Sequence, residues 1–177
     1  MLTRSLLLLS IVAAPAFAQT TPAAAPPRSN TDAARMLWQE VRSNLVKAAD
    51  DTPVAMYDYR PSPDVRSFGE TLDHVAASQS GYCRMALGEK PTGGGAGTGA
   101  KTKADVVEAL RVSNDVCARA YAQADEEAAL PAYGGGRNSR LHVLLVNVMH
   151  DSEHYGNIVT YLRLNGLVPP SSQPSPR

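Results

Sequence analysis

The sequence predicts an all-α fold, an antiparallel bundle of four helices. Four segments of the 177-residue chain carry apolar residues at the three- and four-residue spacing of an amphipathic helix. Helix-capping residues precede these segments, and connections of about 15 residues, rich in glycine or proline, separate them. No segment alternates polar and apolar residues over the length of a strand, so we expect no β-sheet.

The first helix is expected to begin near Asn30 or Thr31 and to end at residues 51–53, Asp-Thr-Pro. A proline disfavours the helical conformation in the residue before it and cannot itself continue the helix. The apolar stripe of this helix consists of Ala34, Leu37, Trp38, Val41, Leu45 and Ala48.

The second helix should begin at a capping box, in which Ser67 and Glu70 each satisfy a backbone N–H of the other. His74 lies slightly off the apolar stripe, beside small residues such as Thr71 and Ser78, which leave room for a ligand next to its ring. The stripe itself comprises Phe68, Leu72, Val75, Gln79, Tyr82, Cys83 and Ala86.

The third helix starts near Thr102, where Asp105 completes a similar capping pattern. It carries Cys117, and the second helix carries Cys83. Two cysteines allow a disulfide in an oxidising compartment, or two buried free thiols, and both alternatives stay open. The cysteines lie at similar distances from the starts of their helices, so a bridge requires these helices to be parallel or staggered.

The last helix is expected over residues 139–165, with Gly166 directly after it and two prolines at 169–170 beyond. Its first half is apolar on nearly every side, through Leu141, Val143, Leu144, Leu145, Val146, Val148 and Met149. Such a helix has to be covered on every side. It is therefore either central in the bundle or part of a subunit interface.

The N-terminus has the pattern of a secretory signal peptide: Arg4, an apolar run too short to span a bilayer, and a small-x-small site ending at Ala18. We expect a signal peptide over residues 1–18 with cleavage after Ala18, and export to the periplasm or the medium. A disordered lead-in over 19–29, a four-helix domain over 30–170 and a tail over 171–177 would follow.

Charge and hydropathy exclude two classes of partner. Cleavage removes Arg4 and leaves 16 basic residues against 17 acidic ones, a net charge of −1. This balance gives no basic surface of the kind that binds nucleic acid. No segment after the signal peptide is apolar enough for a transmembrane helix, so no membrane span is expected.

Two histidines, His150 and His154, lie one helical turn apart, where both imidazoles can reach one metal ion. The chain after His154 has no His, Asp, Glu or Cys, so a third ligand must come from upstream. His142 is too far along the same helix, at a rise of roughly 12 Å. His74 remains, and would join the site if its helix packs against the last one. The alternative is three separate histidines.

Two stretches together resemble the DinB superfamily, also called DinB/YfiT-like metalloenzymes. They are residues 60–76, RPSPDVRSFGETLDHVA, and residues 150–171, HDSEHYGNIVTYLRLNGLVPPS. The resemblance covers about residues 32–172. It implies a four-helix bundle with a metal site formed by His74, His150 and His154. It also implies frequent dimerisation through helices, so a homodimer is a candidate assembly.

Known members of the superfamily include S-transferases that use low-molecular-weight thiols and a maleylpyruvate isomerase. The resemblance therefore implies a metal-dependent enzyme, of hydrolase or transferase type, that acts on an unidentified small molecule, and the signal-peptide pattern adds that this enzyme is exported. The alternative is a non-catalytic helical bundle that binds a metal or a small molecule. Fold alone does not decide between them.

Zn²⁺ is the default ion for three imidazoles with an open position, and Ni²⁺ or Fe²⁺ also suits them. Asp151 is a candidate base, or a partner that orients a ligand. Asn157 and Tyr161 share the face of His150 and are candidates for touching the substrate. The sequence identifies no catalytic residue.

Overall fold

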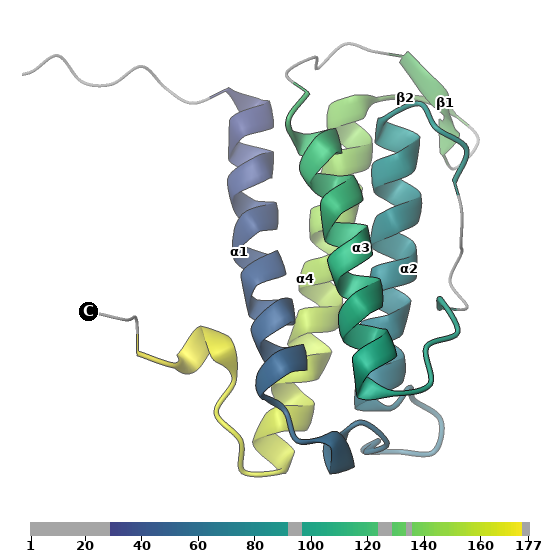
Figure 1. Ribbon diagram of the computed structural model, residues 1–177. Coiled ribbons are helices and arrows are strands. Elements are labelled where there is room, and N and C mark those ends of the chain that lie inside the picture. Colours follow the sequence, from purple (N-terminus) through teal and green to yellow (C-terminus); the bar gives the residue numbers. More distant parts are fainter. Residues whose placement is uncertain (1–28, 92–96, 124–128, 134–135, 175–177) are drawn as a thin grey trace, which may run out of the picture.

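The computed structural model describes residues 29–91, 97–123, 129–133 and 136–174. Four long helices pack side by side, namely α1 (Asn30–Asp51), α2 (Phe68–Ala86), α3 (Lys103–Tyr121) and α4 (Arg140–Leu164) (Figure 1). Short 3-10 helices follow α1 and α4: η1 (Val54–Met56) and η2 (Pro170–Ser172). The all-α class and the four helices predicted from the sequence are confirmed.

The helix ends follow from the capping residues. Both predicted capping boxes form, with Ser67 and Thr102 as the N-caps of α2 and α3. Ser29 caps α1 and Ser139 caps α4, each accepting a backbone N–H with its side-chain oxygen. Gly166 has a φ of 71°, in the left-handed region that glycine adopts readily after a helix.

The directions of the helices refine the antiparallel bundle expected from the sequence. Helices α1 and α4 run one way, and α2 and α3 run the other way (Figure 1). The contacting pairs α2/α4 and α1/α3 are therefore antiparallel, whereas α2 and α3 lie side by side and parallel. A parallel pair needs a connection that returns from one end of the bundle to the other, and residues 87–102 make it.

A disulfide joins the two parallel helices. Cys83 and Cys117 lie near the C-terminal ends of α2 and α3, their Cα atoms are 5.0 Å apart, and both residues are fully buried. Of the two alternatives for the cysteines, the bridge is the one that forms, because the helices run in the same direction. It closes a loop with a sequence separation of 34, a constraint worth about 4 kcal/mol in the chain-entropy model.

Asp73 fixes the last part of the connection that leads into α3. Its carboxylate accepts hydrogen bonds from the backbone N–H groups of Thr98 and Gly99, at 3.0–3.2 Å, and from the Thr98 hydroxyl. Gly97, at a φ of 93°, passes so close that a Cβ there would overlap an Asp73 carboxylate oxygen. This carboxylate therefore ties the connection to the turn of α2 that carries His74.

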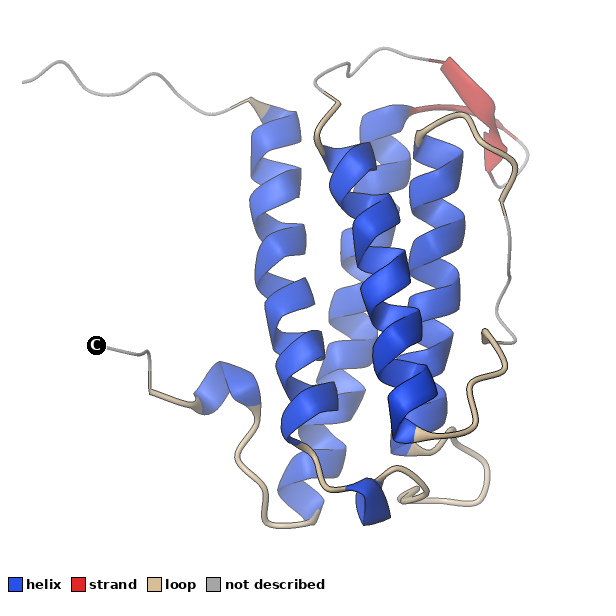
Figure 2. Cartoon of the chain, viewed as in Figure 1, coloured by secondary structure: helices blue, strands red, loops and turns tan. Residues whose placement is uncertain are grey.

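The expectation of no β-sheet is wrong. Strands β1 (Ala129–Tyr133) and β2 (Gly136–Ser139) form a short antiparallel hairpin between α3 and α4 (Figure 2). Strands of five and four residues are too short to show a sustained two-residue alternation. Backbone pairing of Ala129 with Ser139 and of Leu130 with Asn138 defines the hairpin instead.

The apolar core has two halves with a polar layer between them. One half includes Leu45, Phe68, Leu72, Leu110 and Ile158. The other includes Trp38, Cys83, Cys117, Tyr121 and Leu144. Between them along the helices lie the buried polar residues Gln79, Ser113, Asn114 and Asp151, and the buried Asn147 donates a hydrogen bond to Asp151. Polar side chains that are buried in this way have to bond to one another, so the middle of the bundle is where geometry is most constrained.

Helix α4 is covered on one side only. Val143 and Leu144 are fully buried, but Leu145 and Met149 are 46% and 64% exposed. Of the two alternatives for this apolar helix, a fully covered central position is therefore excluded. Its uncovered residues remain available to a subunit interface.

The predicted signal peptide, residues 1–18, and the lead-in as far as residue 28 lie outside the described residues, as do residues 175–177. Helix η2 lies across the predicted domain boundary at residue 170 and contacts α1. Within the described part of the chain, no helix is both long and apolar enough to cross a membrane.

Candidate metal centre

The antiparallel packing of α2 against α4 brings three histidines together. The capping box fixes the start of α2, and His74 lies in the second turn, where it is buried. His150 and His154 lie one turn apart on α4 and are partly buried. The exposed His142 lies apart from them on the first turn of α4, as its spacing predicts.

The distances between the imidazoles suit one shared ion. The Nε2 atoms of His74 and His150 are 3.1 Å apart, and one ring nitrogen from each of the three histidines lies within 4.8 Å of the others. Two ligands of a tetrahedral zinc ion lie roughly 3.3–3.4 Å apart, because each Zn–N bond is about 2.0–2.1 Å. A hydrogen bond explains a pair of close histidines but leaves the convergence of a third unexplained.

The environment keeps His154 in the neutral form that binds metals. Burial lowers its pKa to about 4, and the nearby positive charges of His150, His74 and Arg66 act in the same direction. An imidazole whose proton is so weakly held is neutral at physiological pH, and its lone pair is available to an ion.

Asp151 lies behind His150. Its side chain is fully buried, and burial raises its pKa to about 6. One carboxylate oxygen accepts a hydrogen bond from Asn147 Nδ2 at 3.1 Å, and Asn147 also donates to the Tyr121 hydroxyl at 3.2 Å. The other oxygen, Oδ1, faces His150 Nδ1 at 3.7 Å.

This 3.7 Å separation is too long for a hydrogen bond, and neither Asp151 Oδ1 nor His150 Nδ1 has another partner. A buried acceptor thus faces a buried imidazole nitrogen that can donate. A small movement of either ring or carboxylate would close the bond and leave His150 Nε2 as the metal-binding atom. Of the two roles considered for Asp151, the arrangement fits orientation of His150 and not that of a base, since a fully buried carboxylate cannot touch a substrate.

A pocket of about 510 Å³ opens beside His154. Its lining consists of Asp64, Val65, Arg66, Thr71, His154, Asn157 and Tyr161. Asn157 and Tyr161, the two candidates for substrate contact, are both present. Sequence reasoning missed Arg66 and Asp64, although Arg66 directly precedes the capping box of the helix that carries His74.

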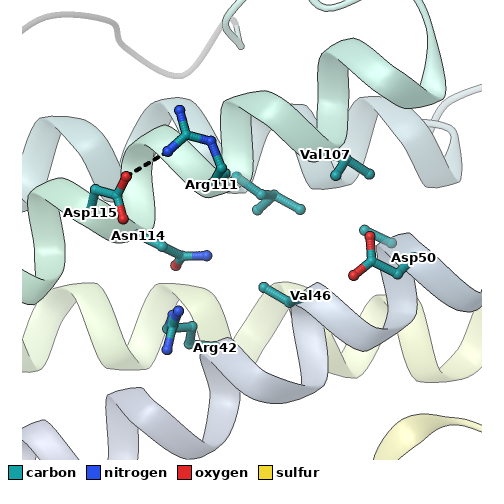
Figure 3. Close-up of a pocket in the computed structure, with 9 residues that line it drawn as sticks. Arg42, Val46, Asp50, Val107, Arg111, Asn114 and Asp115 are labelled. Carbon is teal, nitrogen blue, oxygen red and sulfur yellow. Dashed lines mark hydrogen bonds and ion pairs between the residues drawn. The ribbon is translucent and has the colours of Figure 1, made fainter.

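A second pocket, between α1 and α3, has a different character. It measures about 110 Å³, and its polar rim includes Arg42, Asp50, Arg111 and Asp115 (Figure 3). Arg111 is paired with Asp115 at 2.8 Å, and also with Glu108. No histidine or cysteine lines this pocket, so its charges offer no comparable ligand set.

Comparison with known proteins identifies the family and the fold. The sequence profile of the DinB superfamily matches residues 37–158. A crystal structure of a protein assigned to the DinB family, from Exiguobacterium sibiricum, superposes with a TM-score of 0.60 at 19% sequence identity. The match covers 78% of this chain and 93% of that one, and it shows a shared fold.

A comparison with curated proteins found no match to the chain. The grouping of the three histidines as a candidate metal site therefore rests on the geometry of this chain alone. The comparisons show the family and the fold. The superfamily profile spans more than half of the sequence, from α1 through most of α4. The chain belongs to the DinB superfamily.

Proposed function

We propose that His74, His150 and His154 bind one divalent metal ion and that the protein is a metal-dependent enzyme of hydrolase or transferase type. The observation that carries this proposal is the convergence of three ring nitrogens within 4.8 Å, beside a pocket large enough for a small molecule. Zn²⁺ is the expected ion, and Ni²⁺ and Fe²⁺ suit the same donors.

The histidines, Asp151 and the pocket walls would each have a separate role. Three neutral imidazoles would hold the ion without cancelling its charge, so that it supplies Lewis acidity to a group at its open position. Asp151 would orient His150 from the buried side. The pocket walls, formed by the loop before α2 and by α4, would hold the substrate beside His154.

The pocket favours an enzyme over a non-catalytic metal-binding protein. A purely structural ion is held in a closed shell, commonly by four protein ligands. Among the described residues, the group around this site contains only the three histidines, and a pocket adjoins one of them. Such a site leaves a position for a substrate.

We also propose that the protein is exported to the periplasm or the medium. The disulfide between Cys83 and Cys117 supports export, because disulfides persist in oxidising compartments and are rare in the cytosol. The pattern of residues 1–18 supports it independently. The intact mass of protein recovered from the periplasm or medium should correspond to a chain beginning at Gln19; retention of Met1 in all material would contradict this.

A homodimer is a further part of the proposal. Leu37 on α1 and Leu145 and Met149 on α4 are exposed apolar residues, and the groove beside them joins the same two helices. A second copy of this chain would cover them. Light scattering should show a dimer that Met149→Asp dissociates, whereas a monomeric wild-type protein would exclude this assembly.

The experiment that tests the enzyme proposal is metal analysis of the purified full chain, followed by a panel of hydrolase and thiol-transfer substrates. We expect one ion per chain, lost in His74→Ala and kept in the matched variant His142→Ala. Activity should follow the metal content in both variants. Metal retained in His74→Ala, or metal bound with every tested activity unaffected by that substitution, would contradict the proposal.

A further inference from the structure

We propose that Asn157 is a positioning residue for the metal site. Its side-chain amide turns over when an ion binds, so that the amide oxygen accepts the Nδ1 proton of His154 and leaves His154 Nε2 to the ion. This role of Asn157 rests on the proposed metal site and assigns the atom through which His154 would bind. It follows from one contact between two side chains of α4 and from the chemistry of an amide and an imidazole.

The amide of Asn157 lies against one edge of the His154 ring. Its Nδ2 atom is 3.4 Å from His154 Nδ1. Asn157 follows His154 by three residues on α4, and His150 precedes it by four, so these two neighbours lie on opposite sides of His154 along the helix axis. The nitrogen that faces Asn157 therefore faces away from His150.

The other edge of the ring is left for the remaining imidazoles. The centroid of the His154 ring lies 4.5 Å from that of His150 and 4.7 Å from that of His74. His150 has the same arrangement, since its Nε2 lies 3.1 Å from His74 Nε2 while its Nδ1 faces Asp151. We therefore infer that His154, like His150, offers Nε2 to the ion and Nδ1 to a neighbour on its own helix.

Without an ion, the amide places the proton of His154 on the wrong nitrogen for binding. A neutral imidazole has one nitrogen that donates and one that accepts, whereas an amide nitrogen only donates. Because Asn157 Nδ2 faces His154 Nδ1, Nδ1 is the acceptor and the proton lies on Nε2. An ion at Nε2 requires that proton to move to Nδ1, where it then needs an acceptor.

Rotation of the Asn157 amide by half a turn supplies this acceptor. The rotation exchanges Nδ2 for Oδ1 at nearly the same position, so the helix does not have to move. Asn157 is exposed and lines the pocket beside His154, so water or a bound ligand can take the amide nitrogen that is turned away. An amide thus serves both states of His154. A carboxylate would serve only the metal-bound state, and an apolar side chain would serve neither.

Nitrogen NMR of the isotope-labelled full-length protein provides the test, because protonated and unprotonated ring nitrogens have different chemical shifts. In the wild type, we expect the proton of His154 on Nε2 without metal and on Nδ1 after saturation with Zn²⁺. Asn157→Asp, which keeps only acceptors, should hold the proton on Nδ1 in both states and bind Zn²⁺ at least as tightly as the wild type.

Asn157→Leu removes donor and acceptor, and its affinity for Zn²⁺ should fall roughly tenfold, the lower end of the range for a partner of a metal ligand. Asn44→Leu, the same change on α1 at a residue that does not line the pocket beside His154, is the matched control and should behave as wild type. A chromophoric chelator measures these affinities by competition.

Three results overturn the role of Asn157 while the metal site stands. They are a Zn²⁺-bound His154 with its proton on Nε2, a metal-free His154 with its proton already on Nδ1, and equal affinities in Asn157→Leu and Asn44→Leu. A wild-type protein that binds no Zn²⁺ overturns the metal site itself.

Discussion

Two pairs of antiparallel helices in this bundle enclose pockets, and the pockets differ in how their polar groups are satisfied. Between α1 and α3, Arg111 is paired with Asp115 one turn further along its own helix (Figure 3), and with Glu108 one turn before it. Between α2 and α4, three histidines converge from two helices, and His150 Nδ1 and Asp151 Oδ1 lack hydrogen-bond partners.

This difference distinguishes a ligand-binding site from a solvated groove. Charges that neutralise each other along one exposed helix need nothing further, and their contribution to stability is small. Buried polar atoms without partners are costly, and they persist where a ligand or a small rearrangement completes them. By this criterion the α2/α4 pair, unlike the α1/α3 pair, has buried polar atoms that a small rearrangement beside the histidines would complete.

The largest expected effect is on stabilisation by metal. Zn²⁺ at 1,000 times its dissociation constant should raise the unfolding free energy of the wild-type protein by about 4 kcal/mol, since it binds only the folded state. His74→Ala should abolish this rise. Asn114→Ala, a change to a buried polar residue of the α1/α3 pocket, should lower stability yet preserve the response to metal.

Urea denaturation with Zn²⁺ and with a chelator measures these changes. If Zn²⁺ raises the unfolding free energy of His74→Ala as much as that of the wild type, the metal binds elsewhere. The proposed difference between the two pairs of helices would then be wrong.

The next effect concerns the residue behind the site. Asp151→Asn replaces the carboxylate that faces His150 with a neutral amide, and metal affinity should fall by about 10- to 100-fold, roughly 1.4–2.7 kcal/mol. Asp115→Asn is the matched change in the α1/α3 pocket and should leave the affinity unchanged. Competition with a chromophoric chelator gives both values. Equal metal affinities in Asp151→Asn and Asp115→Asn would show that Asp151 does not support metal binding.

The histidine cluster between α2 and α4 should give the metal-free protein a pH-dependent stability. The folded-state pKa of His154 is about 4, below its ordinary value of 6.5, so the unfolded chain binds the proton more readily between these values. The wild type should therefore lose stability relative to His154→Ala as the pH falls from about 6.5 to about 4. The raised pKa of Asp151 acts in the opposite direction but is common to both proteins.

Urea unfolding at both ends of this pH range provides the comparison. His142→Ala, at an exposed histidine, should parallel the wild type. A stability gap between wild type and His154→Ala that is the same at both pH values would refute the expected dependence.

The smallest effect is expected at the rim of the α1/α3 pocket. Arg111→Gln removes the ion pairs with Glu108 and Asp115, all of which are largely exposed, and stability should hardly change. Metal affinity should be unaltered. A clear fall in the midpoint of thermal unfolding would mean that this rim is as constrained as the histidine cluster.

The parts of the fold that depend on local signals were predictable from the sequence. Capping residues such as Ser67 and Thr102 act on their own helix, so they located the helix starts without knowledge of the tertiary structure. The histidines were also predictable, because elimination left His74 as the remaining partner for a pair one turn apart, and the structure brings these three together.

Features that depend on the path of the chain were not predictable. The sequence of residues 87–102 does not say whether the connection turns back directly or crosses the bundle, so the parallel direction of α2 and α3 needed the structure. Arg66 was missed for a similar reason. It joins the site only because the loop before α2 is held against Tyr161, 95 residues away in the sequence.

The parallel packing of α2 and α3 has an electrostatic consequence. Neighbouring helices that run the same way align their macrodipoles, which places two partly positive ends together and two partly negative ends together. Glu70 and Asp105 lie in the first turns of these helices, and Arg84 and Arg119 lie in the last turns. Glu89 joins the two arginines, at 2.9 and 3.2 Å. Each shared end thus carries side chains of the opposite sign, and the pair can lie side by side without an uncompensated dipole at either end of the bundle.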